Sequence, residues 1–191
     1  MQATKKLLKR FLRAMAKHKI PFAVGGGVAV NAHGFRRETT DIDAFLHDED
    51  RARVRTALLE AGFRIGRIYP PFHYIAVLPG IDDPDIRIDL LYPAAEPDLS
   101  AIDHPTLLEV WGECVPVFAI EFLIASKLQA IADQPARASQ DRADIATLYS
   151  IGAFVPGTVK YLLSSFASEL EPLLDEIIKQ PKGQGSLGRR R

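Results

Sequence analysis

The hydrophobic and polar positions change their period along the chain, and this change predicts a mixed core followed by helices. Apolar residues at helical spacing predict an amphipathic helix over 3–18. Short apolar or alternating runs predict strands over 21–24, 40–46, 64–68, 73–78, 85–92 and 115–118. Helical patterns are predicted over 28–33, 50–61, 120–132, 138–150 and 156–178. The order of elements predicts an α/β (α+β) fold, a mixed sheet core flanked by helices with a C-terminal helical part.

This order also predicts how the chain is divided. Residues 1–118 are expected to form the α/β core, including the N-terminal helix, and residues 119–179 the helical C-terminal part. Residues 180–191 contain Gly, Ser and Arg with almost no apolar residue, which predicts a disordered basic tail.

Charge is unevenly distributed, although the formal net charge is zero. Seven of the 24 Lys and Arg residues lie in 1–20 and five in 179–191, which leaves 12 basic against 24 acidic residues between them. An acidic core favours clustered carboxylates that hold a metal, whereas basic ends either contact RNA or are simply solvated.

Composition excludes several classes of protein. The single cysteine, Cys114, excludes an intrachain disulfide and a Cys-rich zinc site. No apolar run approaches the roughly 20 residues that span a bilayer, so we expect no membrane association and a cytoplasmic location.

Two carboxylates at i and i+2 are the first candidate for chemistry. Asp41 and Asp43 lie on a predicted strand, where alternate side chains point to the same face, while Ile42 points to the core. Two like charges this close repel each other unless a cation lies between them. Mg²⁺ (or Mn²⁺) suits this place because it is a hard ion that prefers oxygen ligands and phosphates.

A glycine run precedes this pair. Gly25, Gly26 and Gly27 join a strand to a helix start, and residues without Cβ let backbone amides approach a phosphate. The run lacks the Lys-Ser/Thr ending of a Walker loop. It also lacks the dinucleotide-binding fingerprint, because Val30 stands where the third glycine would be.

Asp89 is the third carboxylate of interest. It lies on the predicted strand 85–92 with apolar neighbours on the opposite face, and Asp85 shares its own face. A third acid aimed at the pair would complete a two-metal site or accept the proton of an attacking hydroxyl.

These residues resemble a known family. The run from Val24 to Asp43, with its glycine turn, helix and Arg37-Glu38-Thr39-Thr40-Asp41-Ile42-Asp43, resembles the signature of the DNA polymerase β-like nucleotidyltransferase superfamily. It is most similar to minimal bacterial members, namely the AbiEii and related toxin-type nucleotidyltransferases of toxin–antitoxin and abortive-infection systems. The run 122–131 followed by 140–145 is similar to their helical motif, and the resemblance covers roughly residues 20–150.

The resemblance implies roles for individual residues. Asp41, Asp43 and Asp89 would be the catalytic metal ligands, with Asp89 alternatively the base. Gly26, Gly27, Arg37, Thr40 and Lys127 would bind the nucleotide. Asp141 and Asp144 are left open between capping a helix and serving the site. One departure is the third glycine, since many active members have a serine in this turn.

The function implied is metal-dependent transfer of a nucleoside monophosphate from an NTP to an acceptor hydroxyl. A tRNA 3′ end or other RNA, a protein hydroxyl and a small molecule are the candidate acceptors, in a toxin–antitoxin or phage-defence setting with a cognate antitoxin as partner. The alternative is a catalytically silent member of the fold that binds a nucleotide or a partner.

Overall fold

Seven strands form one mixed sheet in the part of the chain that the computed structural model describes, residues 2–69, 71–135 and 138–179. The strands are β1 (Ala23–Val24), β2 (Ile42–Phe45), β3 (Arg64–Tyr69), β4 (His73–Val77), β5 (Ile88–Leu91), β6 (Thr106–Val110) and β7 (Glu113–Val117). Their order in the sheet is β3-β4-β5-β2-β1-β7-β6. The pairs β2–β5 and β1–β7 are parallel and the remaining pairs are antiparallel. The predicted mixed sheet core is therefore confirmed.

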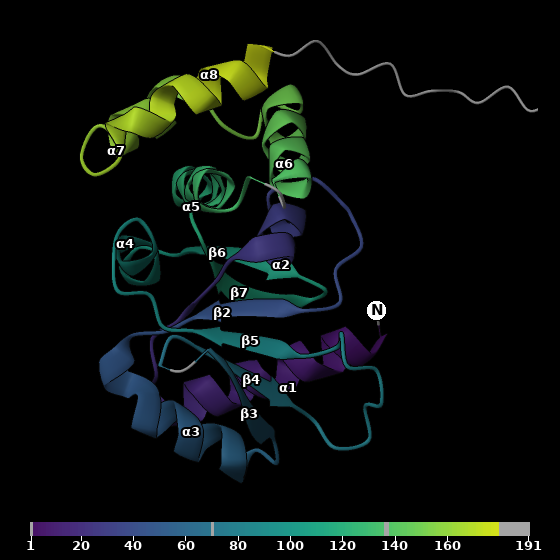
Figure 1. Cartoon of the computed structure of the whole chain (residues 1–191). Helices are drawn as coiled ribbons and strands as arrows, with labels where there is room; N and C mark the ends of the chain where they lie inside the picture. Colours follow the sequence, from purple (N-terminus) through teal and green to yellow (C-terminus); the bar gives the residue numbers. More distant parts are fainter. Residues whose placement is uncertain (1, 70, 136–137, 180–191) are drawn as a thin grey trace, which may run out of the picture.

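Helices cover both faces of this sheet. They are α1 (Gln2–His18), α2 (Gly26–Ala32), α3 (Arg51–Glu60), α4 (Asp98–Asp103), α5 (Ile120–Asp133), α6 (Ser139–Ser150), α7 (Pro156–Leu163) and α8 (Glu171–Lys179). Figure 1 shows α1 and α3 on one face, α2, α4 and α5 on the other, and α6 to α8 beyond α5. No described helix combines the length and apolar character needed to cross a bilayer.

The amphipathic pattern of α1 explains its place. Leu7, Leu8, Phe11 and Met15 are fully buried, and the Phe11 ring meets Phe22 edge-on at a centroid distance of 5.1 Å. Burying an aliphatic or aromatic side chain of this size contributes roughly 1.5–3 kcal/mol. This stripe fastens α1 to the sheet and leaves its basic residues towards solvent.

The register between β2 and β5 positions the acidic residues. Ile42 lies opposite Ile88, and Asp43 lies opposite Asp89. Side chains alternate along each strand, so the two isoleucines fill the core on the α1–α3 face. The two aspartates consequently share the other face, beside α2 and α5.

Two stretches differ from the sequence-based prediction. No helix or strand was predicted between residues 93 and 114, but this segment contains the short helix α4 and the strand β6. The helix predicted over 156–178 is interrupted, because Ala167 takes an extended φ of −155° and a new helix begins at Glu171. Pro172 explains the restart: proline fits the first turn of a helix and breaks an interior.

The predicted division of the chain at residue 118 stays a prediction. The tail predicted over 180–191 lies outside the described residues.

Candidate functional site

Asp41, Asp43 and Asp89 come together at the start of β2 and β5. One oxygen of each carboxylate can be chosen so that all three lie within 4.8 Å of one another. In the described part of the chain they form the one group of three or more acidic, histidine or cysteine side chains that could hold a metal. The three acids predicted from the sequence therefore lie together in the structure, at the start of two neighbouring parallel strands.

Like charges dominate the surroundings of Asp43. Burial, and then the neighbouring charges of Asp41 and Asp89, raise the pKa of this carboxyl to about 7, although Lys127 and Arg87 act in the opposite direction. Each of these repulsions would be relieved by a cation placed between the carboxylates. Three oxygen ligands of this kind fit a hard divalent ion such as Mg²⁺.

Two side chains contact the carboxylate of Asp89 directly. Its Oδ1 lies 2.7 Å from His73 Nε2, and Arg87 Nε lies 3.1 Å from its Oδ2. The carboxylate is buried, with its side chain 6% exposed. His73 and Arg87 therefore fix the direction of Asp89 towards the other two acids.

The glycine turn packs directly against the acids. Gly26 has a φ of +53°, and a Cβ at this position would overlap Asp43 Oδ2. A Cβ at Gly27 would lie 2.5 Å from Thr39 Oγ1. The first glycine is thus required by its left-handed backbone and by the approach of Asp43, and the second leaves room for the Thr39 hydroxyl. That hydroxyl also donates to Asp41 Oδ1 at 3.1 Å.

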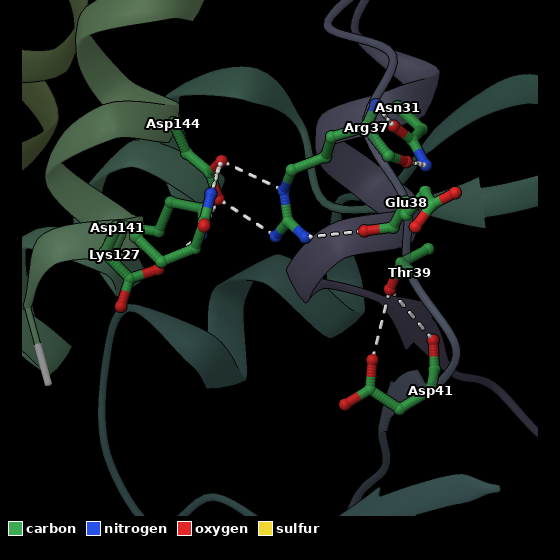
Figure 2. Close-up of polar contacts among 9 residues, drawn as sticks. Asn31, Arg37, Glu38, Thr39, Asp41, Lys127, Asp141 and Asp144 are labelled. Carbon is green, nitrogen blue, oxygen red and sulfur yellow. Dashed lines mark hydrogen bonds and ion pairs between the residues drawn. The ribbon is translucent and has the colours of Figure 1, made fainter. Parts of the chain in front are cut away.

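The buried carboxylate of Asp144 contacts both cations beside the glycine turn, Lys127 and Arg37. Asp144 is fully buried, and its Oδ2 lies 2.8 Å from Lys127 Nζ and accepts a hydrogen bond from Arg37 Nη2 at 3.0 Å. Lys127 Nζ also lies 2.5 Å from Asp141. Figure 2 shows the Arg37 guanidinium pointing to Asp144 while its loop continues through Thr39 to Asp41.

These groups surround a hollow of about 460 Å³. It is lined by Gly26, Gly27, Arg37, Asp41, Asp43, Lys127, Ala130, Gln134, Gln140 and Asp141. Most of the predicted nucleotide-binding residues border this space. Thr40 is exposed and does not line it, whereas its neighbour Thr39 contacts Asp41.

Asp85 lies outside the cluster. The strand begins at Ile88 rather than at Asp85, and Asp85 sits exposed in the preceding turn. Its backbone amide donates to Asp83 at 3.0 Å. The strand alternation that linked Asp85 to Asp89 therefore does not apply to it.

Sequence reasoning missed Thr39, His73 and Arg87 as parts of this site. Arg87 had an available signal, since it lies at i−2 from Asp89 on an extended segment. The position of His73 depends on the antiparallel pairing of β4 with β5, which places His73 opposite Leu91. No local pattern specifies that pairing.

Known proteins share this fold. The solution structure of the antibiotic-resistance factor ANT(2″)-Ia has a TM-score of 0.60 and 18% identity, covering 92% of this chain and 91% of that one. An antigenic nucleotidyltransferase-like protein from Paracoccidioides brasiliensis has a TM-score of 0.58 and 17% identity, covering 93% and 92%. TM1012 of Thermotoga maritima, assigned to the nucleotidyltransferases, has a TM-score of 0.56 and 14% identity, covering 71% of this chain and 89% of that one. No curated protein matches the sequence.

The mixed sheet and its similarity to these structures define a protein of the nucleotidyltransferase fold. The family model for the nucleotidyl transferase AbiEii toxin of type IV toxin–antitoxin systems matches residues 7–184. The chain belongs to this family, which confirms the resemblance seen in the sequence.

The pKa of Asp43 predicts how metal-free stability depends on pH. Between about pH 4 and 7 the unfolded chain has lost this proton while the folded protein keeps it, so rising pH favours unfolding. We expect Tm to fall by roughly 4–8 °C from this group between pH 5 and 8. Thermal melts in EDTA across this range measure the effect.

An Asp43→Asn variant is the control, because it keeps the other titrating groups. Asp98, for example, is largely buried, which raises its pKa to about 6. The difference between the two Tm curves isolates Asp43. Parallel curves for the two proteins would contradict the crowded-carboxylate interpretation.

Proposed function

We propose that the protein transfers a nucleoside monophosphate from an NTP to an acceptor hydroxyl. The acceptor oxygen attacks the α-phosphorus, the bond from that phosphorus to the β-phosphate oxygen breaks, and pyrophosphate leaves. The observation that carries this proposal is the carboxylate triad, with oxygens within 4.8 Å, beside a hollow that two glycines and two cations line. The reaction class follows from this combination of metal ligands and phosphate-binding groups.

Each group has a proposed role in this reaction. Asp41 and Asp43 would hold Mg²⁺ or Mn²⁺, with Asp89 as the third ligand or as the base that takes the acceptor's proton. The metal would supply charge neutralisation on the triphosphate and the leaving group. Backbone amides at Gly26 and Gly27 would contact the phosphates.

Lys127 and Arg37 would complete the phosphate site. Lys127 Nζ lies against Asp141 and Asp144 in this structure. Asp141 borders the hollow and its side chain is 28% exposed. We infer that a triphosphate replaces Asp141 as a partner of Lys127, while buried Asp144 continues to position both cations.

The position of Thr39 favours a catalytically active protein over a catalytically silent one. The missing serine of the glycine turn raised the alternative of a fold that binds without reacting. Thr39 Oγ1 lies 2.5 Å from where the Cβ of residue 27 would be, so a hydroxyl from the neighbouring loop occupies this space. In this structure the hydroxyl donates to Asp41 Oδ1 at 3.1 Å and so helps to hold a carboxylate of the triad in place.

The family implies a biological setting for this activity. We propose that the protein acts as the toxin of a pair and that a cognate antitoxin restrains it. A tRNA 3′ end or other RNA, a protein and a small molecule are the candidate acceptors. The cytoplasm, where NTP and these acceptors occur together, is the proposed location.

The direct test is transfer of label. The purified protein is incubated with each α-³²P-labelled NTP, Mg²⁺ and separated RNA, protein and small-molecule fractions of a lysate. Label in one fraction, abolished by EDTA and by Asp41→Ala, supports the proposal. Metal-dependent NTP binding without transfer to any fraction would overturn it and leave the silent binding protein.

Replacing Gly26 with alanine is expected to lower transfer by about 100-fold or more. The added methyl group displaces the Asp43 carboxylate, and the left-handed backbone costs roughly 1–2 kcal/mol for a residue with Cβ. Initial rates and thermal melts measure both effects. Gly157→Ala in α7 is the matched control, since its methyl group would meet nothing within 4 Å. Equal rates for the two variants would contradict the proposed role of the turn.

A further inference from the structure

A second hollow of about 460 Å³ adjoins the proposed catalytic site. It is lined by Asn31, Ala32, Arg36, Arg37, Glu109, Val110 and Trp111. Arg37 borders both hollows. Nothing in the reaction proposed above uses the rest of this second space.

Trp111 occupies an unusual backbone position on the wall of this hollow. It is the first of the two residues that join β6 to β7, with a φ of +52°, and Gly112 follows with a φ of +83°. Hairpin turns with two positive φ values strongly favour Asn-Gly or Asp-Gly. A bulky side chain in this conformation is strained, and such strain is concentrated at functional sites.

Packing against the core restricts the Trp111 ring. It is partly buried and packs against the hydrophobic core while also lining the hollow. It is also the only tryptophan of the chain. The result is a fixed aromatic surface beside a polar space.

Charged groups complement this aromatic surface. Arg36 and Glu109 are exposed, and among the described residues neither makes an ion pair. Asn31 holds the backbone of Arg37 on both sides, donating to its carbonyl at 2.9 Å and accepting from its amide at 2.7 Å. An aromatic ring, a free guanidinium and a free carboxylate together match a base, a phosphate and an exocyclic amine.

We propose that this hollow is a subsite for a nucleotide of the acceptor strand, with its base stacked on Trp111 and its phosphate on Arg36. The proposal rests on the transferase function above and selects single-stranded RNA among its three acceptors. A saturated aminoglycoside-like molecule has no planar ring to stack, and a protein hydroxyl brings no base or phosphate. Glu109 would accept a hydrogen bond from an exocyclic amine of the base.

Distance along the chain supports this geometry. Arg37, on the wall of this hollow, is only four positions before Asp41 of the carboxylate triad. Four residues span at most about 14 Å when extended. Arg37 thus joins the two hollows, and a base on Trp111 would belong to a nucleotide upstream of the 3′ hydroxyl at the proposed metal site.

The single tryptophan gives a direct readout of binding. Emission of the wild-type protein is titrated with a single-stranded RNA hexanucleotide that has a free 3′ hydroxyl, with Mg²⁺ and a saturating α,β-methylene NTP analogue present. Saturable quenching by the RNA is the expected result. Quenching by the analogue alone, with no further change on adding RNA, would assign the hollow to the donor base and overturn the proposal.

Variants separate stacking from folding. Trp111→Asn places the favoured residue in the turn, which offsets the packing that the indole loses against the core, so we expect the variant to remain folded. The acceptor KM should rise roughly 5- to 150-fold, the range for loss of one stacked base, with the NTP KM unchanged. Leu107→Ala, at a residue of β6 that is 66% exposed and outside the hollow, is the matched control and should leave both constants unchanged.

The outcomes distinguish this inference from the function on which it rests. Transfer of label to a protein or small molecule with unchanged tryptophan emission would refute the subsite and leave the transferase intact. Quenching by RNA without transfer to any acceptor would refute the transferase and leave an RNA-binding site. An unchanged RNA KM in Trp111→Asn would also refute the subsite.

Discussion

Replacing Asp43 with asparagine should lower nucleotidyl transfer by about 10³-fold or more and at the same time stabilise the metal-free protein at pH 8. The loss of activity would follow from removing a charged group proposed to hold the metal where charge develops in the transition state, and 10³-fold corresponds to about 4 kcal/mol. The gain in stability follows from removing one of three crowded negative charges, the one whose pKa is raised to about 7. Three units of pKa correspond to roughly 4 kcal/mol at pH 8, or about 8–16 °C in Tm.

Single-turnover rates with Mg²⁺ and melts in EDTA measure these two effects on the same preparation. Asp85→Asn is the matched control, because Asp85 is exposed and lies outside the triad, and it should change neither quantity. A lower Tm for Asp43→Asn in EDTA would show that Asp43 is a structural acid, and the metal-site assignment would then fail.

Asp89→Asn should show that a carboxylate of this triad can serve both activity and stability. It should also abolish transfer, but it leaves the Arg87 guanidinium without its carboxylate partner. The metal-free protein should therefore lose about 1–3 kcal/mol rather than gain stability. Both variants should lose activity, but Tm should rise for Asp43→Asn and fall for Asp89→Asn. The difference would arise because Asp89 has an ion-pair partner, Arg87, whose loss is destabilising.

The sequence predicted the strands that carry the acidic triad better than the segments around them. Asp41 and Asp43 at i and i+2 require only the alternation of an extended chain, which is a local property. The apolar neighbours of Asp89 likewise identified its strand. The register that places Asp43 opposite Asp89 is a long-range property, and it was anticipated only through resemblance to a family.

Loop residues could not be assigned in this way. Thr40 was expected at the nucleotide on the strength of the motif, but Thr39 is the threonine that contacts Asp41. The loop 33–41 has no period that fixes which side chain turns inwards. Asp144 was left undecided for a different reason, because near the predicted start of a helix the same residue could cap the helix or serve the site.

Asp144 is expected to be the polar residue whose removal destabilises the protein most. Asp144→Ala leaves Arg37 and Lys127 facing each other without the buried carboxylate that neutralises them. Removing one partner of a buried ion pair typically costs 3–5 kcal/mol, which corresponds here to roughly 6–20 °C in Tm. Thermal or urea unfolding measures this loss. Asp175→Ala is the matched control: its ion pair with Lys160 is partly exposed and should contribute little to stability.

A double-mutant cycle shows whether Asp144 acts through Lys127. Lys127→Met alone leaves Asp144 with Arg37, and the double variant removes both ends of one pair. If the pair acts as a unit, the double variant should be more stable than the sum of the single losses by at least about 1 kcal/mol. Strict additivity would mean that Asp144 serves the fold through Arg37 alone. Asp144 would then not position Lys127 for phosphate binding. Asp141 would be the carboxylate that positions Lys127.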